Sequence, residues 1–98
     1  MIMKAVLIVH NVAIDGEINE ALEALGIRYF TKFTDTLGKG QISEPHLNSD
    51  IWPGTNWGTL VVVEDLQAKA VISRVRQLRQ TLGKEGVKAF MWTIEEMT

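Results

Sequence analysis

Two segments of this 98-residue chain are apolar at every position, and they constrain its fold more than any other feature. One reads Ala-Val-Leu-Ile-Val over residues 5–9, and the other reads Leu-Val-Val-Val over residues 60–63. A strand with one buried face alternates between apolar and polar residues, whereas a strand covered on both sides is apolar throughout. Both segments are therefore predicted to be inner strands of a sheet that is buried on both faces.

Each of these predicted strands is followed by a segment with helical periodicity. Asp15 is predicted to cap the first helix and Gly26 to end it, while Asp65 caps the second and Gly83 ends it. The predicted buried stripe of the first helix consists of Ile14, Ile18, Ala21, Leu22 and Leu25. That of the second consists of Leu66, Ala70, Val71, Val75, Leu78 and Leu82. The other side of the second helix carries four basic residues and is predicted to be solvated.

Residues 27–33 alternate in polarity and residues 87–93 form a further strand, so the predicted order is βαββαβ. This order predicts a single domain over residues 1–98 with a ferredoxin-like α+β fold. Four antiparallel strands would form one sheet, with both helices on one of its faces. The other face would be open although it is apolar, and we expect copies of the chain to cover it in a closed homo-oligomer.

A polar segment over residues 37–58 separates the second and third predicted strands, and it is long for a loop in so small a domain. It contains Trp52 and Trp57, which could contact a target protein or pack against a neighbouring subunit. His46 and Asp50 have the i, i+4 spacing of two metal ligands, but two ligands do not make a site. The loop is therefore predicted to carry function.

Composition excludes several classes of protein. The net charge of −2 argues against a nucleic-acid partner, and the absence of cysteine excludes disulfides and thiolate metal sites. The longest apolar run is too short to cross a membrane or to serve as a signal sequence, so a cytoplasmic protein is expected. Neither a nucleophile paired with His and an acid nor two convergent carboxylates can be recognised, which favours a non-enzymatic protein.

Two glycine-rich motifs could bind an anion through backbone N–H groups assisted by lysine. The first is Gly38-Lys39-Gly40-Gln41, at the exit of the second predicted strand. The second is Gly83-Lys84-Glu85-Gly86-Val87-Lys88, which leads into the last strand and lacks the spacing of a Walker loop. Each also has a simpler interpretation, as the start of a flexible loop and as a glycine helix cap followed by a turn.

These motifs, taken in this order and with the long loop between them, resemble the P-II signalling family (nitrogen regulatory protein P-II), in particular a small divergent subgroup. The resemblance implies a homotrimer with adenine-nucleotide clefts between subunits, and ATP or ADP as the effector. It places the nucleotide-binding residues at Gly38, Lys39, Gly40, Gln41, Gly83, Lys84, Gly86 and Lys88. It places the contacts to a target protein at Ser43, His46, Trp52 and Trp57.

A P-II-like signal-transduction protein of this kind would sense the small effector and regulate its target, a transporter or a metabolic enzyme, through the loop. The loop contains no tyrosine, so the uridylylation known in part of the family cannot occur on the usual residue. The alternative is a metal-responsive protein similar to the CutA branch of the same fold, in which His46 and Asp50 would bind the metal.

Overall fold

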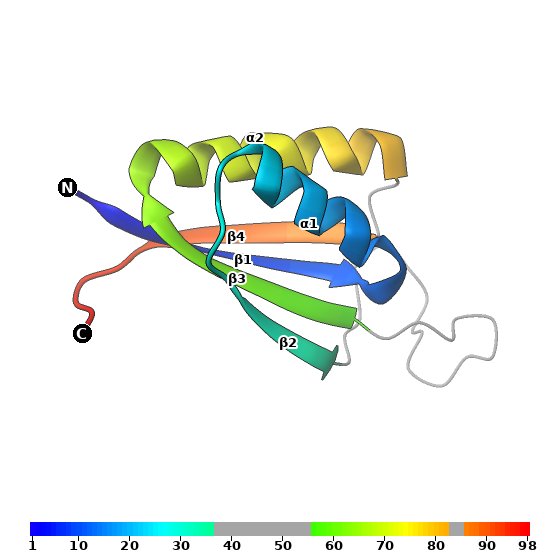
Figure 1. Ribbon diagram of the computed structural model, residues 1–98, viewed down its shortest axis with the longest axis horizontal. Coiled ribbons are helices and arrows are strands. Elements are labelled where there is room, and N and C mark those ends of the chain that lie inside the picture. Colours follow the sequence, from blue (N-terminus) through cyan, green and yellow to red (C-terminus); the bar gives the residue numbers. More distant parts are fainter. Residues whose placement is uncertain (37–55, 83–85) are drawn as a thin grey trace.

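A computed structural model of the chain contains four strands and two α-helices (Figure 1). It describes residues 1–36, 56–82 and 86–98. The elements are β1 (Met3–Asn11), the 3₁₀ turn η1 (Val12–Ile14), α1 (Asp15–Ala24), β2 (Thr31–Thr36), β3 (Asn56–Glu64), α2 (Asp65–Leu82) and β4 (Val87–Thr93). The predicted βαββαβ order is confirmed. No helix within these described ranges is long and apolar enough to cross a membrane.

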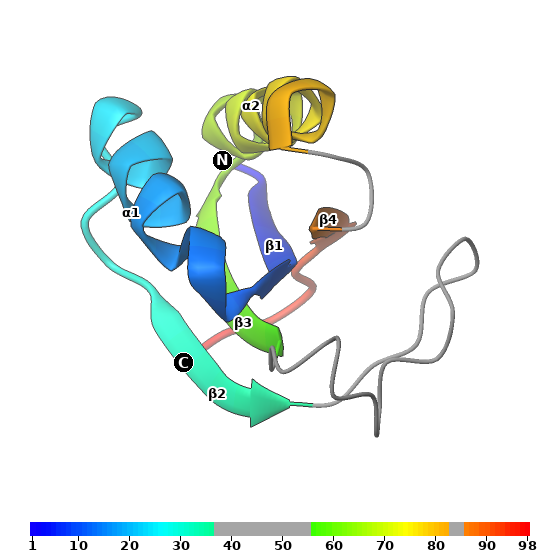
Figure 2. The same ribbon diagram turned by 90° about the vertical axis from the view of Figure 1, so that its right-hand side faces the viewer.

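The strands form one antiparallel sheet in the order β2-β3-β1-β4, so the two segments that are apolar throughout are its two inner strands. In the registers of β1, Ile8 lies opposite Thr59 of β3 and Ala89 of β4. Both helices cover the same face of the sheet (Figures 1 and 2). The ferredoxin-like α+β fold expected from the sequence is thus confirmed.

The hydrophobic core lies between this face and the helices. Alternate residues of the inner strands point toward the helices, among them Val6 and Ile8 of β1 and Val61 of β3. Ile18 and Leu22 of α1 and Val71 of α2 meet them from above, and all six side chains are at most 2% exposed. Burial of such apolar side chains is the main favourable term in folding.

The opposite face of the sheet is apolar and open, as predicted. The cross-strand registers place on it the residues that alternate with the core residues, such as Leu7 and Leu60. Its large exposed side chains, between 37% and 47% accessible, are Phe33, Val62, Phe90 and Trp92. No described helix lies on this side in either view (Figures 1 and 2).

The start of α1 differs from the prediction. Asp15 does not cap the helix; instead the Asn11 side chain accepts a hydrogen bond of 2.8 Å from the Ala13 N–H and caps η1, which leads directly into α1. The Asp15 carboxylate is used in contacts with the sheet. Gly26 ends α1 in a left-handed conformation with φ 75°, as predicted.

Two boundaries and one helical face also differ. β2 begins at Thr31 rather than at residue 27, and β3 begins at Asn56, inside the predicted loop of residues 37–58. On α2 the buried residues are Ala68, Val71, Val75 and Leu78. Leu66 is 80% exposed, because its position two residues before Ala68 lies on the far side of a helix with 3.6 residues per turn. Leu82, in the last turn, is 38% exposed.

Candidate functional site

Only part of the predicted nucleotide site can be located, because most of its residues lie outside the described ranges. This applies to Gly38, Lys39, Gly40, Gln41, Gly83 and Lys84, and equally to Ser43, His46, Asp50 and Trp52 of the loop. Gly86, Lys88 and Trp57 are described. The strands on either side of these segments nevertheless fix where the segments attach to the sheet.

Both predicted anion-binding segments adjoin the same end of the sheet. β2 ends at Thr36 and β3 begins at Asn56 at this end, where Gly86 also precedes β4. However, β2 and β4 are the two opposite edge strands (Figure 2). Three inter-strand spacings of about 4.8 Å separate them by roughly 14 Å. A single phosphate group therefore cannot bridge the two strand ends of one chain.

The beginning of β4 is held by two hydrogen bonds. The Asn11 N–H donates to the Gly86 carbonyl at 2.9 Å, and Arg79 Nη1 of α2 donates to the Val87 carbonyl at 2.9 Å. Lys88 lies opposite Val9 on the open face, with Nζ 5.5 Å from the centre of the Phe90 ring. This distance is in the range of a cation–π contact. The structure thus places one predicted phosphate-binding lysine on the apolar open face.

A partly buried polar cluster lies at the same end of the sheet, on the helix side, and the sequence did not predict it. Lys32 Nζ of β2 donates to Asp15 Oδ1 at 2.6 Å and to Thr59 Oγ1 at 3.0 Å. Asn19 Nδ2 of α1 donates to Asp15 Oδ2 at 3.2 Å, and Thr59 Oγ1 lies 3.0 Å from His10 Nε2. These five residues, which we call the polar cluster, join β1, β2 and β3 to α1.

The hydrogen bonds around His10 fix its tautomer. His10 Nδ1 lies 3.1 Å from the Asn11 carbonyl oxygen, which can only accept, so Nδ1 carries the hydrogen. Nε2 must then accept a hydrogen bond from the Thr59 hydroxyl. Burial lowers the pKa of His10 below its ordinary value of 6.5; the nearby Lys32 charge also lowers it, while the Asn11 carbonyl and Asp15 act in the opposite direction. His10 is therefore neutral at pH 7.

Thr59, His10 and Asp15 include the residue types of a hydrolase triad, but their geometry does not support that chemistry. In a triad the acid contacts the ring nitrogen that faces away from the nucleophile. Here Asp15 Oδ1 lies 3.7 Å from Nε2, the same nitrogen that faces Thr59. Thr59 and His10 are also at most 1% exposed, so a substrate has no access. The cluster is structural rather than catalytic in this arrangement.

Trp57 does not lie in the loop where the sequence prediction placed it. It belongs to β3 and lies opposite His10 on the helix-covered side of the sheet. Its side chain is half-buried, and its Nε1 is buried without a hydrogen-bond partner among the described residues. The Trp57 side chain is therefore less accessible to a target protein than the sequence suggested.

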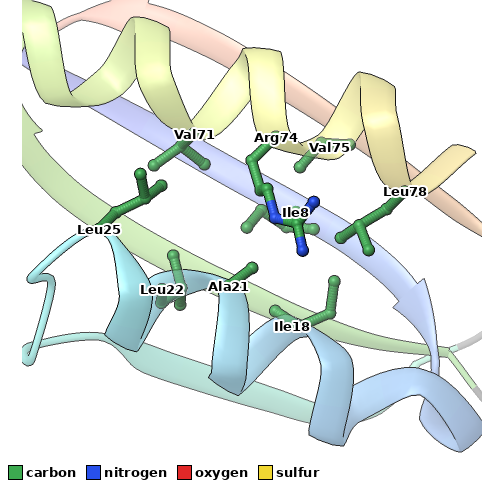
Figure 3. A pocket seen from close by; sticks show the side chains of 9 residues that line it. All are labelled: Ile8, Ile18, Ala21, Leu22, Leu25, Val71, Arg74, Val75 and Leu78. Atoms are coloured by element: carbon green, nitrogen blue, oxygen red, sulfur yellow. The ribbon is translucent and has the colours of Figure 1, made fainter.

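A shallow groove lies between α1 and α2 (Figure 3). Its walls are core residues such as Ile18, Leu22 and Val75, and Arg74 extends over it. The lining is otherwise apolar, so the groove offers little to a polar nucleotide. Within the described ranges, no group of three His, Cys, Asp or Glu residues could hold a metal ion, and the predicted pair His46 and Asp50 lies outside them.

Comparison with known proteins gives structural matches only: no family model and no curated protein matches the sequence. A PII-like signalling protein of Thermus thermophilus superposes with a TM-score of 0.67 at 21% identity, over 96% of this chain and 87% of that chain. The apo form of CPII from Thiomonas intermedia K12, a nitrogen regulatory PII-like protein, gives a TM-score of 0.73 at 14% identity, over 96% and 90%.

B. subtilis GlnK, solved as its ATP complex, gives a TM-score of 0.67 at 20% identity, over 96% of this chain and 85% of that chain. At such low identity a match demonstrates the fold and leaves ligands and partners open. The resemblance expected from the sequence is confirmed at this level. Over nearly its whole length, the chain has the fold of PII-like signalling proteins.

Proposed function

We propose that the chain is a non-catalytic regulatory protein of PII type that binds an adenine nucleotide between subunits and controls a target protein through residues 37–55. The observation that carries this proposal is the position of the two predicted anion-binding segments. They adjoin the same end of the sheet but opposite edge strands, β2 and β4. Because the two segments attach to opposite edges, this arrangement supports a site in which a second copy of the chain supplies one of the two sides.

The open face of the sheet supports association of copies. Phe33, Phe90 and Trp92 leave a large apolar surface exposed on the single chain, which is unfavourable in water. In a closed trimer the three sheets would cover one another, and the β2 edge of one copy would approach the β4 edge of the next. The two lysine-bearing motifs would then face one phosphate chain from two sides.

The structural relatives show that this fold accepts such ligands. CPII of Thiomonas intermedia K12 has been solved with ADP and bicarbonate, and GlnK of B. subtilis with ATP. We extend nucleotide binding to this chain, with Gly38, Lys39, Gly40 and Gln41 on one side and Gly83, Lys84, Gly86 and Lys88 on the other. Binding would order the loop, whose residues Ser43, His46 and Trp52 would contact the target.

Isothermal titration with ATP and ADP tests the proposal, together with sedimentation analysis of the subunit number. We expect heat of binding, one site per subunit and a trimeric mass. The Lys39→Ala and Lys88→Ala variants should each weaken binding about tenfold or more, since each removes one charge from the phosphates. The matched control is Lys69→Ala, because Lys69 lies on α2 with 62% of its side chain exposed. Absence of heat at millimolar nucleotide would overturn the proposal.

A further inference from the structure

The polar cluster has no part in the proposed function, yet its two charged side chains, Lys32 and Asp15, are only 19% and 20% exposed, and charged residues are mostly more exposed than this. His10 of β1 joins this cluster through Thr59 and is 1% exposed. The charged groups that face it are Asp15 from α1 and Lys32 from β2. From β3 it meets Thr59 and Trp57, and from β4 the apolar Val87, whose carbonyl is held by Arg79 of α2.

When His10 is neutral, the hydrogen bonds form a directed chain. Lys32 donates to the Thr59 hydroxyl oxygen, the hydroxyl donates to His10 Nε2, and Nδ1 donates to the Asn11 carbonyl. In this arrangement the Thr59 hydroxyl and the His10 Nδ1–H each have an acceptor. Lys32 Nζ simultaneously donates to Asp15 Oδ1 and so connects the first residue of α1 to β2.

Protonation of His10 breaks this chain, because Nε2 becomes a donor. The Thr59 oxygen would then receive hydrogen bonds from both Nε2 and Lys32, and its own hydrogen would lose its acceptor. A second acceptor is close by: Asp15 Oδ1 lies 3.7 Å from Nε2. Charged His10 would therefore compete with Lys32 for this carboxylate, and two positive charges would face each other within the cluster.

We propose that His10 is a proton-operated switch that, when neutral, lets Lys32 hold the start of α1 against the sheet and, when protonated, loosens that contact. Residues 37–55 and the entry to β4 attach to the same end of the sheet, where β2 ends and β3 and β4 begin. Asn11 lies at this end too, where it caps η1 and donates to the Gly86 carbonyl. The switch is a property of the chain alone and does not depend on nucleotide binding.

The sign of the pH dependence follows from the folded pKa, which is lower than the ordinary value of 6.5. Above 6.5 His10 is neutral in both the folded and the unfolded chain, and the full contribution to stability is present. Below 6.5 the unfolded chain takes up a proton that the folded chain resists, so the free energy of unfolding falls as the pH drops. The start of α1 should lose protection in the same direction.

Amide hydrogen exchange between pH 5 and 7.5, corrected for intrinsic exchange, tests the switch. In the wild-type chain we expect the protection of α1 to fall relative to that of α2 as the pH is lowered between these limits, because protonation of His10 favours the loosened contact. His10→Gln removes the titration and should abolish the fall. His46→Gln, which alters the only other histidine, should retain it.

A second measurement covers the case in which His10→Gln does not fold. The ring C–H signals of the two histidines give the His10 midpoint by NMR, and Lys32→Met should move that midpoint to higher pH, since it removes the facing positive charge. An unchanged or lower midpoint in Lys32→Met would overturn the proposal. So would an equal pH-dependent loss of α1 protection in wild type and His10→Gln.

Discussion

The two faces of the sheet are built from similar apolar residues, but helices cover only one of them. Adjacent residues of β1 illustrate the contrast: Ile8 points into the core and is 1% exposed, whereas Leu7 points to the open face and is only half-buried. The strand sequence therefore specifies how many faces need to be covered and leaves open what covers each. On the helix side the chain supplies the cover, and on the other side we expect copies of the chain to do so.

The largest expected effect separates these two neighbours. Ile8→Ala should lower the free energy of unfolding by about 2–5 kcal/mol at any protein concentration, because it leaves a cavity inside one chain. Leu7→Ala should lower the free energy of unfolding by an amount that depends on protein concentration, because the contacts that it removes are made with other copies of the chain. Urea unfolding at several protein concentrations measures both. Equal and concentration-independent losses would show that the open face stays uncovered.

A charge on the open face should break association while leaving the fold intact. Phe90 is 47% exposed on the single chain, so Phe90→Glu is tolerated by the monomer but places a carboxylate in the proposed interface. We expect association to weaken by at least about 2 kcal/mol per subunit, roughly thirtyfold in a dissociation constant. Sedimentation equilibrium measures this, with Leu66→Glu as control because Leu66 is 80% exposed on α2. A Phe90→Glu chain of unchanged assembly mass would contradict the prediction.

The features that the sequence predicted are those encoded locally. Apolar residues on both faces identified the inner strands, periodicity identified the helices, and Gly26 identified the end of α1, because each signal lies within one segment. The order of the elements then restricted the topology to few choices. The fold and the apolar open face were therefore predictable from the sequence.

The features that the sequence missed depend on residues far apart in the chain. Asp15 has the usual properties of a helix cap, but Lys32, 17 residues later, provides a stronger partner for its carboxylate. Trp57 lies between Asn56 and Gly58, both typical of loops, and joins β3 because β1 extends far enough to pair with it. The polar cluster could not be recognised for the same reason, since its residues come from four elements.

On the helix-covered side of the sheet, the contribution of the polar cluster to stability can be compared with that of the apolar core by removing the Lys32–Asp15 ion pair. Lys32→Met keeps most of the side-chain volume but leaves Asp15, about 20% exposed, without its 2.6 Å partner. We expect a loss of about 1–3 kcal/mol, between the values for exposed and fully buried pairs. The loss should shrink in the Asp15→Asn, Lys32→Met double variant, because no unpaired charge then remains. Thermal or urea unfolding measures both, and additive losses would contradict a direct coupling between the two residues.

The smallest expected effect comes from an exposed lysine–aspartate ion pair on α2. Lys69 and Asp65 form an i, i+4 pair of 3.1 Å on α2, but the lysine side chain is 62% exposed. Water and salt screen such a pair, so Lys69→Met should change the free energy of unfolding by at most about 0.5 kcal/mol. This pair is longer and more exposed than the Lys32–Asp15 pair, and Asp65 also lies 3.8 Å from Lys4, so Lys69→Met does not leave the carboxylate alone. Urea unfolding of both variants at low and high salt measures the difference, and a Lys69→Met loss as large as that of Lys32→Met would contradict the prediction.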